Sequence, residues 1–455
     1  MQKGIGADDM KKSAILLTIM TILTLIIGGC TKDDNGEWAP FKKDEQASLK
    51  IMYWDEKSFY EDYGMMFQSE FPNVAFEIIS LPSNTDPPLP VYELYNRYIE
   101  QNQPDILMVT PNHRWLAEEG MLLELDTLIE RDKFDLDSYL STVVSMLRKE
   151  GDGKLYGLAP SFSSYGIYYN LDLFQKHGID LPRDSMTWEE IFELAARFPA
   201  EGDGSDSIYG FTIDEFSSPL EDILLSWLAQ NKKMLNQDGS GVQLDSESWR
   251  TTFESLVSAV QSGALYHPSP EELAQKFRDR KEHRFLNGTA AMTYNSEHLI
   301  PALNRSEINW GVASAPVDPL NRTQSSAYSL GPTFVIVKQS SNARAAWEFV
   351  KYVNSASFAQ IKSKASGDIL FSRSEFIRPQ GERDISALYR LEAIADLTNE
   401  FDSFDGALRL KMVRIIVNEL VDVIDRVKTL DEAIEKMQEE GTAMLFQARS
   451  AAAAP

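Results

Sequence analysis

The stretch Leu49-Lys50-Ile51-Met52-Tyr53-Trp54 sets the pattern from which the fold can be predicted. It is apolar at every position except Lys50, which is typical of a strand buried in a sheet. A helical pattern at 59–69 follows, then a second strand at 74–79, and a strand at 106–109 comes after a further helix. Strands that alternate with helices in this way predict an α/β fold with an open, largely parallel sheet.

The composition limits the possible partners. The chain has 455 residues, with 69 acidic and 44 basic side chains, and its formal net charge is -25. This length suffices for two or three domains with substantial apolar cores. A chain this acidic repels phosphate backbones and anionic lipid headgroups, which argues against binding to nucleic acid or to charged membrane surfaces. The single cysteine allows neither an intramolecular disulfide nor a thiolate metal cluster.

The first thirty residues have the layout of a secretory leader. The positive residues Lys11 and Lys12 precede an apolar run, 14–27, that is interrupted only by threonines and is shorter than a comfortable bilayer span. The segment Leu25-Ile26-Ile27-Gly28-Gly29-Cys30 at its end resembles a bacterial lipobox. An ordinary signal peptide with an incidental cysteine is the alternative interpretation.

The lipobox implies a processed and anchored protein. We predict a lipoprotein signal peptide over 1–29, acylation of Cys30 at the new N-terminus, and a flexible tether over 30–46. Two or more acyl chains hold a protein on a membrane durably, whereas one chain binds only marginally. The expected location is the extracellular face of a bacterial cell membrane.

Three helix starts are marked by capping boxes, in which a hydroxyl residue is followed three positions later by glutamate. Each pair is expected to satisfy the free amide groups at the start of a helix. The pairs are Thr187 with Glu190, Ser269 with Glu272, and Thr429 with Glu432.

Several short motifs, in a fixed order along residues 48–446, together resemble a known family. The chain is similar to the sugar-binding type of extracellular solute-binding proteins, family 1, which feed ATP-binding cassette (ABC) importers and include the maltose-binding proteins. The motifs lie at Pro104–Leu107, Trp115–Leu122, Lys154–Pro160, Gly166–Phe174, Thr187–Glu190, Phe285–Met292, Trp310–Ala313 and Ala345–Val350.

The resemblance implies a two-lobe, periplasmic-binding-protein-like fold of class II. Its lobes are discontinuous in sequence, and three crossing segments join them, expected near 157–162, 326–332 and 367–371. Lobe 1 is expected at 47–158 plus 332–366, and lobe 2 at 163–326 plus 371–448.

The resemblance also implies a function without catalysis and without a cofactor. The protein would capture a mono- or oligosaccharide between its lobes, as a monomer, and deliver it to the permease subunits of an ABC importer. One alternative is a surface-anchored glycan-degrading enzyme, which would need two carboxylates about 5 to 10 Å apart. No acidic pair stands in a recognisable catalytic setting. The other alternative is a sugar-sensing subunit that docks on a membrane receptor.

Candidate ligand contacts are aromatic and polar residues, because a sugar offers flat C–H faces and many hydroxyls. Trp54 ends the first predicted strand and Asp55 follows it, at the carboxyl end of the strand, where ligands meet open α/β sheets. Core packing is the alternative for Trp54. In the second lobe the resemblance points to Ser163, Ser164, Tyr165, Trp227, Tyr294, Asn295, Glu297, His298 and Tyr328.

Other residues of the types found in binding sites have different expected roles. Glu297 and His298 stand where sugar-binding relatives commonly carry an aromatic residue, which suggests more polar recognition. Trp188, Trp310 and Trp347 are expected in the core. The five histidines lack paired metal spacing, and the acidic loop 202–207 lacks the glycine and closing glutamate of a calcium loop, so no metal site is expected.

Overall fold

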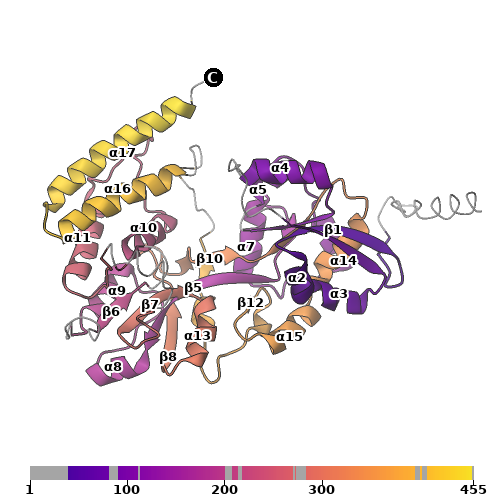
Figure 1. Ribbon diagram of the computed structural model, residues 1–455, viewed down its shortest axis with the longest axis horizontal. Helices are drawn as coiled ribbons and strands as arrows, with labels where there is room; N and C mark the ends of the chain where they lie inside the picture. The colour runs from indigo at the N-terminus through magenta and orange to yellow at the C-terminus, as the bar shows by residue number, and fades with distance from the viewer. Residues whose placement is uncertain are drawn as a thin grey trace, which may run out of the picture. The chain divides into compact units, whose positions relative to one another are not determined.

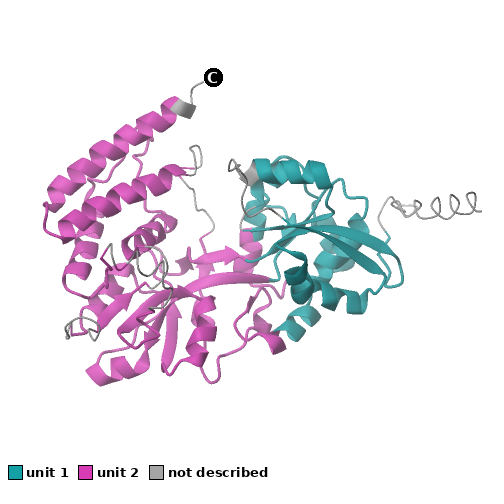
Figure 2. Ribbon diagram, viewed as in Figure 1, with its two compact units in different colours: residues 1–136, 147–160, 331–362 teal, residues 137–146, 161–330, 363–455 magenta. Residues whose placement is uncertain are grey.

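The chain divides into two compact units, each built from separated stretches of sequence (Figure 2). Unit 1 comprises residues 1–136, 147–160 and 331–362, and unit 2 comprises residues 137–146, 161–330 and 363–455. Residues 137–146 and 363–366, which the family resemblance placed in lobe 1, group with unit 2.

The computed structural model describes residues 39–80, 91–110, 113–199, 208–213, 218–269, 272, 283–394, 400–401 and 407–452. The predicted signal peptide, Cys30, the tether as far as residue 38 and the acidic loop 202–207 lie outside these residues.

Unit 1 contains a five-stranded sheet in the order β2-β1-β3-β11-β4. Strand β1 pairs in parallel with β2 and β3, as predicted, but β11 is antiparallel to both β3 and β4. The prediction of a largely parallel sheet therefore fails at β11, which comes from a segment far along the chain. The strands are β1 (Ala47–Tyr53), β2 (Val74–Ser80), β3 (Ile106–Val109), β4 (Gly157–Leu158) and β11 (Thr333–Ile336).

The predicted helix at 59–69 is present but interrupted. It consists of α2 (Glu56–Phe59), a π-helical turn (Tyr60–Gly64) and α3 (Met65–Glu70). Phe59 and Phe67 from this segment pack against Phe349 of α14, with ring centroids 5.8 and 5.2 Å apart. The remaining helices with residues in unit 1 are α4 (Val91–Asn102), α5 (Arg114–Glu118), α6 (Asp126–Asp132), α7 (Ser141–Glu150), α14 (Ala343–Val353) and α15 (Ala356–Ala365).

Unit 2 is organised around the long strand β5 (Figure 1). Its main sheet has the order β10-β5-β7-β6, and β8 and β12 also pair with β5. Every partner of β5 is antiparallel to it. The strands are β5 (Ser161–Asn170), β6 (Tyr209–Thr212), β7 (Ala290–Ser296), β8 (Trp310–Ser314), β10 (Tyr328–Leu330) and β12 (Leu370–Phe371), with a separate pair, β9 (Gln324–Ser325) and β13 (Glu392–Ala393).

The helices of unit 2 bury a large apolar core against this sheet. Helices α16 and α17 lie side by side (Figure 1). Trp188 and Trp310 in this unit and Trp347 in unit 1 are at most 2% exposed, which confirms that they belong to the core. The helices are α8 (Leu171–His177), α9 (Trp188–Ala195), α10 (Pro219–Ala229), α11 (Glu247–Gln261), α13 (Ile300–Arg305), α16 (Ala407–Ile424) and α17 (Leu430–Ala452).

All three predicted capping pairs make their hydrogen bonds. At the start of α9, the amide of Glu190 donates to Thr187 Oγ1 and the amide of Thr187 donates to Glu190 Oε2. The pairs Ser269 with Glu272 and Thr429 with Glu432 bond in the same reciprocal way. The local sequence signal therefore placed the starts of α9 and α17 correctly, whereas the residues that follow Ser269 lie mostly outside the described part of the chain.

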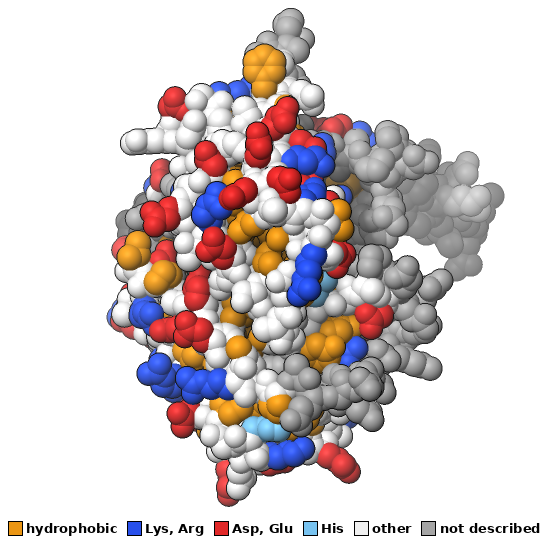
Figure 3. Space-filling model, turned by 90° about the vertical axis from the view of Figure 1, so that its left-hand side faces the viewer, with side chains coloured by type: hydrophobic (Ala, Val, Ile, Leu, Met, Phe, Trp, Pro, Cys, Tyr) orange, Lys and Arg blue, Asp and Glu red, His pale blue; other side chains and the backbone are white. Residues whose placement is uncertain are grey.

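The surface mixes charges of both signs. Figure 3 shows one face of the molecule, on which acidic, basic and apolar side chains are interspersed. Within the described ranges, no helix has both the length and the apolar character that a membrane crossing requires.

Candidate functional site

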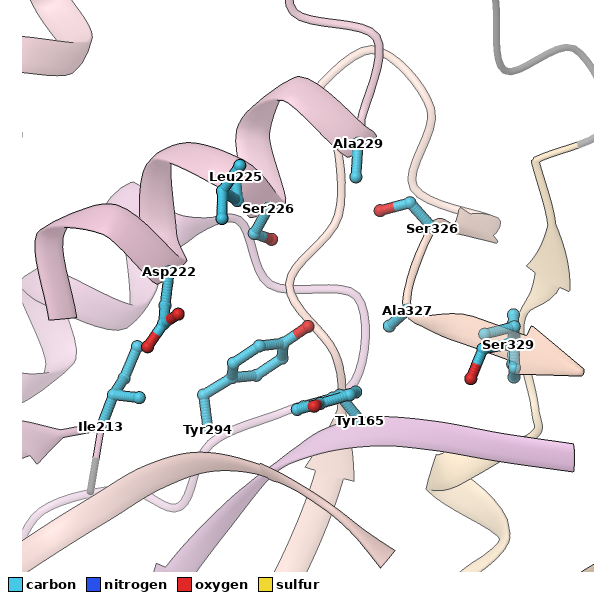
Figure 4. Close-up of a pocket in the computed structure, with 11 residues that line it drawn as sticks. Tyr165, Ile213, Asp222, Leu225, Ser226, Ala229, Tyr294, Ser326, Ala327 and Ser329 are labelled. Atoms are coloured by element: carbon cyan, nitrogen blue, oxygen red, sulfur yellow. The ribbon is translucent and has the colours of Figure 1, made fainter. Parts of the chain in front are cut away.

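Unit 2 contains a pocket of about 260 Å³ whose lining comes from helix α10, from strands β5 and β7, and from the segment 326–329 (Figure 4). All of its lining residues belong to unit 2. They are Tyr165, Ile213, Asp222, Leu225, Ser226, Ala229, Tyr294, Ser326, Ala327, Tyr328 and Ser329.

Two half-buried tyrosines, Tyr165 and Tyr294, form an aromatic platform in this pocket. Their ring centroids are 5.0 Å apart and their planes differ by 28°. The β5–β7 register explains the pairing, because Tyr165 lies opposite Ser296 and Tyr294 lies opposite Ile167. The two tyrosines are therefore diagonal neighbours on one face of the sheet, within reach for large side chains. Trp188 meets the Tyr294 ring edge-on at 5.2 Å and supports the platform from the core.

Helix α10 presents its half-buried face to the pocket. Asp222, Leu225, Ser226 and Ala229 recur at the spacing of one helix face and all line the pocket. In Figure 4 the side chains of Asp222 and Ser226 project from the helix toward the level of the tyrosines. The pocket thus receives a carboxylate and a hydroxyl from one helix.

Trp227 lies on the opposite, buried stripe of α10, together with Leu220, Ile223 and Leu224. Its side chain is 5% exposed, and its ring packs at 6.4 Å from that of Trp188. The structure therefore does not bring Trp227 into the pocket of the tyrosines. The helical spacing of Trp227 with Leu220, Ile223 and Leu224 indicates that it is buried, whereas the family resemblance pointed to a ligand contact.

Glu297 does not line the pocket, but it accepts hydrogen bonds from the strand that carries Tyr165. The Ser163 hydroxyl lies 2.9 Å from both carboxylate oxygens, and the Ser164 amide donates to Oε2 at 3.0 Å. The Glu297 side chain is only 4% exposed, while that of His298, whose Nε2 lies 3.5 Å from Oε1, is 78% exposed. The predicted Ser163, Ser164, Glu297 and His298 are thus brought together, with the carboxylate fixing the strand that carries Tyr165.

Asn295 and Tyr328 also make hydrogen bonds to other residues of unit 2. Asn295 is buried, and its side-chain oxygen accepts a hydrogen bond from the Ser296 amide. The Tyr328 hydroxyl donates to the Leu391 carbonyl oxygen at 2.6 Å, and burial raises the pKa of this phenol. Tyr328 therefore lines the pocket, but its hydroxyl already donates its hydrogen bond to Leu391.

The two predicted ligand contacts in unit 1, Trp54 and Asp55, differ from each other in environment. Trp54 is 53% exposed, so the alternative that it packs in the core is wrong. Asp55 caps helix α2, because its carboxylate accepts hydrogen bonds from the amide and hydroxyl of Ser58 at 2.9 and 2.7 Å. These hydrogen bonds lower the pKa of Asp55. Both residues belong to unit 1, whereas the pocket belongs to unit 2.

Sequence reasoning missed part of the pocket lining. Asp222 and Ser226 could have been found from the i, i+4 spacing on one face of α10. Ser326 and Ser329 flank Tyr328 in the second predicted crossing, but no motif distinguishes them from other loop serines.

The lining has a defined chemistry. Among the described residues it combines tyrosine rings, serine hydroxyls and one carboxylate, that of Asp222, and no lysine or arginine. In the part of the chain that the structure describes, no cluster of three His, Cys, Asp or Glu side chains could hold a metal ion. Ring faces and hydroxyls suit a ligand with C–H faces and many hydroxyl groups.

Comparison with known proteins gives consistent matches. The model of the bacterial extracellular solute-binding protein family matches residues 95–373. The sn-glycerol-3-phosphate-binding periplasmic protein of Brucella abortus is 25% identical over 207 residues, which are 44% of this chain and 45% of that protein. The chain thus spans about half the length of such curated relatives.

Solved structures show the same fold at low identity. A sugar transporter from Rhizobium etli, in an open conformation, matches with a TM-score of 0.64 and 20% identity, over 87% of this chain and 99% of that one. The sugar-binding protein MalE from Xanthomonas citri matches with a TM-score of 0.63 and 17% identity, over 89% and 98%. These likenesses confirm the predicted two-lobe α/β fold class.

Proposed function

We propose a function from the premise that this chain belongs to the bacterial extracellular solute-binding protein family, as its motifs predicted. Members of this family are binding proteins that act outside the cytoplasm, not enzymes. On this premise, the protein captures a small carbohydrate and delivers it to the permease subunits of an ABC importer. The aromatic platform of Tyr165 and Tyr294 in the unit 2 pocket is the observation that carries this proposal.

The composition of the pocket favours a carbohydrate over a glycerol phosphate, the ligand named for one relative. A phosphate ester needs cationic or amide donors, whereas the lining residues that the structure describes include Asp222 and no basic side chain. The hydroxyls of a sugar can donate hydrogen bonds to a carboxylate, which a fully ionised phosphate group cannot do.

The expected affinity follows from the ring faces. Covering about 60 Å² of one ring contributes roughly 1.5 kcal/mol at about 25 cal/mol per Å². Two or three such faces, with several hydrogen bonds, reach micromolar binding, which corresponds to about -8 kcal/mol. In this proposal Tyr165, Tyr294 and Tyr328 contact the ligand, and Ser163, Ser164, Asn295, Glu297 and His298 support them. Trp54 is an exposed ring of unit 1.

Calorimetry on the purified full chain tests this proposal. The ligand panel should hold mono- and oligosaccharides together with sn-glycerol 3-phosphate, and product analysis should follow each titration. We expect 1:1 binding of a sugar, recovered chemically unchanged. Tighter binding of the glycerol phosphate than of any sugar would contradict the ligand class, and turnover of a glycan would favour the enzyme alternative.

Two variants connect the binding to the pocket. Tyr294→Ala should weaken sugar binding about tenfold, because one ring face is worth roughly 1.5 kcal/mol. Phe446→Ala is the matched control, because Phe446 is an exposed ring, 72% accessible, on α17. Equal affinities for these two variants would show that the ligand binds elsewhere.

The lipid anchor is a separate proposal, supported by the sequence around Cys30 alone. We expect the protein to fractionate with membranes and to carry acyl chains on Cys30. The Cys30→Ser variant should lack these chains in intact-mass measurements. Finding an unmodified Cys30 in the wild-type protein purified from membranes would refute the anchor without affecting the proposed ligand class.

A further inference from the structure

We propose that a second pocket of unit 2 binds small zwitterions of the free amino acid type, with Lys232 pairing with the ligand's carboxylate and Glu189 with its ammonium group. This site is separate from the aromatic pocket, because the two pockets share no lining residue among those that the structure describes. The amino acid site and the proposed carbohydrate function can therefore fail independently.

The second pocket has the size of a small-molecule site and carries charges of both signs. Its volume is about 410 Å³, within the range of about 300 to 1,000 Å³ that is typical of ligand sites. Its lining comes from helices α9, α10 and α11, from the residues after α10, and from the loop that follows β8. The charged side chains in its described lining are two basic and two acidic ones, Lys232, Lys233, Glu189 and Asp318.

Lys232 provides a positive charge that no ion pair compensates in the part of the chain that the structure describes. Its Nζ donates hydrogen bonds to the carbonyl oxygen and the hydroxyl of Ser248, at 3.2 and 3.0 Å, and lies 5.1 Å from the centroid of the Trp249 ring. Burial lowers the pKa of Lys232, although the charges of Glu189 and Asp318 act in the opposite direction. The two carboxylates are therefore near this ammonium group, but they do not make up for its lost hydration.

The two carboxylates of the pocket differ in their contacts. Glu189 lies in the first turn of α9, is half-buried, and makes no side-chain hydrogen bond or ion pair with another described residue. The Asp318 carboxylate instead accepts a hydrogen bond from the Leu320 amide at 2.7 Å and so holds its own loop in place. Glu189 is therefore the acceptor available to a ligand's ammonium group, and Asp318 adds negative charge beside it.

A zwitterion matches this arrangement better than a ligand with one charge or none. A neutral ligand that fills the pocket removes water from Lys232 and Glu189 without pairing either charge. A ligand with one charge pairs with one of these groups and leaves the other unpaired. The carboxylate and ammonium groups of an amino acid make charge-assisted hydrogen bonds to both.

Apolar side chains in the same lining indicate which amino acids fit. Trp227 and Trp249 line the pocket and are at most 5% exposed, whereas Leu320 is 95% exposed. A ligand that covers the Leu320 side chain removes apolar surface from water, which favours binding. We therefore expect amino acids with apolar side chains, such as leucine and phenylalanine. Trp227, which the family resemblance named as a ligand contact, belongs to this second pocket.

Calorimetry with matched amino acid derivatives tests this inference on the purified full chain. The probes are L-leucine and L-phenylalanine, each compared with its amide, which lacks the carboxylate, and with its N-acetyl form, which lacks the ammonium group. We expect the free amino acids to bind about tenfold or more tightly than either blocked form, because each blocked form loses one charge-assisted hydrogen bond.

Two variants each remove one charge from the pocket. Lys232→Gln should weaken leucine binding about tenfold and leave the weak binding of leucinamide nearly unchanged. Glu189→Gln should weaken leucine binding by a similar factor and spare N-acetyl-leucine, and it provides the test if Lys232→Gln folds poorly. Lys176→Gln on α8 and Glu193→Gln on α9 are the matched controls, because both residues are exposed and neither lines the pocket.

Each outcome decides the inference. A preference for the free amino acids that disappears in Lys232→Gln or Glu189→Gln, and persists in both controls and in Tyr294→Ala, supports it. Failure of both amino acids to bind, equal binding of their blocked forms, or a preference that survives both pocket variants overturns it and leaves the carbohydrate function untouched. Loss of amino acid binding in Tyr294→Ala would place the amino acid in the aromatic pocket, which overturns this inference and contradicts the proposed carbohydrate ligand.

Discussion

His113 should make the stability of this protein sensitive to mild acid. The imidazole directly precedes helix α5 in unit 1 and is fully buried. Neither of its ring nitrogens has a hydrogen-bond partner among the described residues. Burial lowers the pKa of His113 from 6.5 to about 4, because the charged imidazolium would lose its hydration there.

The direction of the pH effect follows from proton binding. Between pH 6.5 and about 4, the unfolded chain protonates this histidine while the folded chain keeps it neutral. Stability is therefore fully retained above the unfolded pKa and falls as the pH is lowered through this window. Each pKa unit corresponds to about 1.4 kcal/mol, so the loss is about 2 kcal/mol at pH 5 and about 3 kcal/mol near pH 4.

The test compares wild type with His113→Phe in urea unfolding at several pH values. Substitution changes the absolute stability by a packing term that does not depend on pH, whereas all other titrating groups are shared and cancel in the comparison. Between neutral pH and about pH 5, wild type should lose about 2 kcal/mol more than the variant. Parallel pH profiles of the two proteins would refute the reasoning.

Three further perturbations have calculable effects on unfolding. Thr187→Ala removes the side-chain cap of α9 and should cost about 1 kcal/mol in urea unfolding, while Thr187→Ser should restore most of it. Burial opposes ionisation of Asp132, but hydrogen bonds from its neighbours, including the Trp347 indole, lower its pKa to about 2. The ionised Asp132 should therefore contribute about 2 kcal/mol to the free energy of unfolding above pH 3.8, and this contribution should disappear as the pH falls toward 2. Acid titrations followed by circular dichroism should show this loss in wild type but not in Asp132→Asn. Gly210→Ala should destabilise by about 2 kcal/mol or more in thermal unfolding, because the added Cβ would lie 2.1 Å from the Ala195 carbonyl oxygen, and an unchanged melting temperature would contradict this.

Several elements could be predicted from the sequence because their signals are local. The run 49–54 and the strand at 106–109 are apolar over the length of a buried strand, and both form strands at nearly the predicted bounds. The capping pairs depend only on residues three positions apart. Such features need no knowledge of distant parts of the chain.

The candidate site is different, because contacts between distant segments create it. Tyr165 and Tyr294 meet through the register of β5 and β7, and Ser163 meets Glu297 across 134 positions. The Tyr328 hydroxyl finds its acceptor 63 positions further along the chain. Sequence reasoning could name these residues from a family resemblance, but not the partners that each one has.

The exposure of individual side chains also separates what the sequence predicts from what only the tertiary structure decides. The sequence by itself determined that Trp54 ends an apolar strand and that the chain has the motifs of its family. Only the tertiary structure decided that Trp54 is exposed, that Trp227 is buried and that Asp222 lines a pocket. The physical reason is that a side chain's exposure depends on which distant elements pack over it, and this packing is fixed only when the whole core assembles.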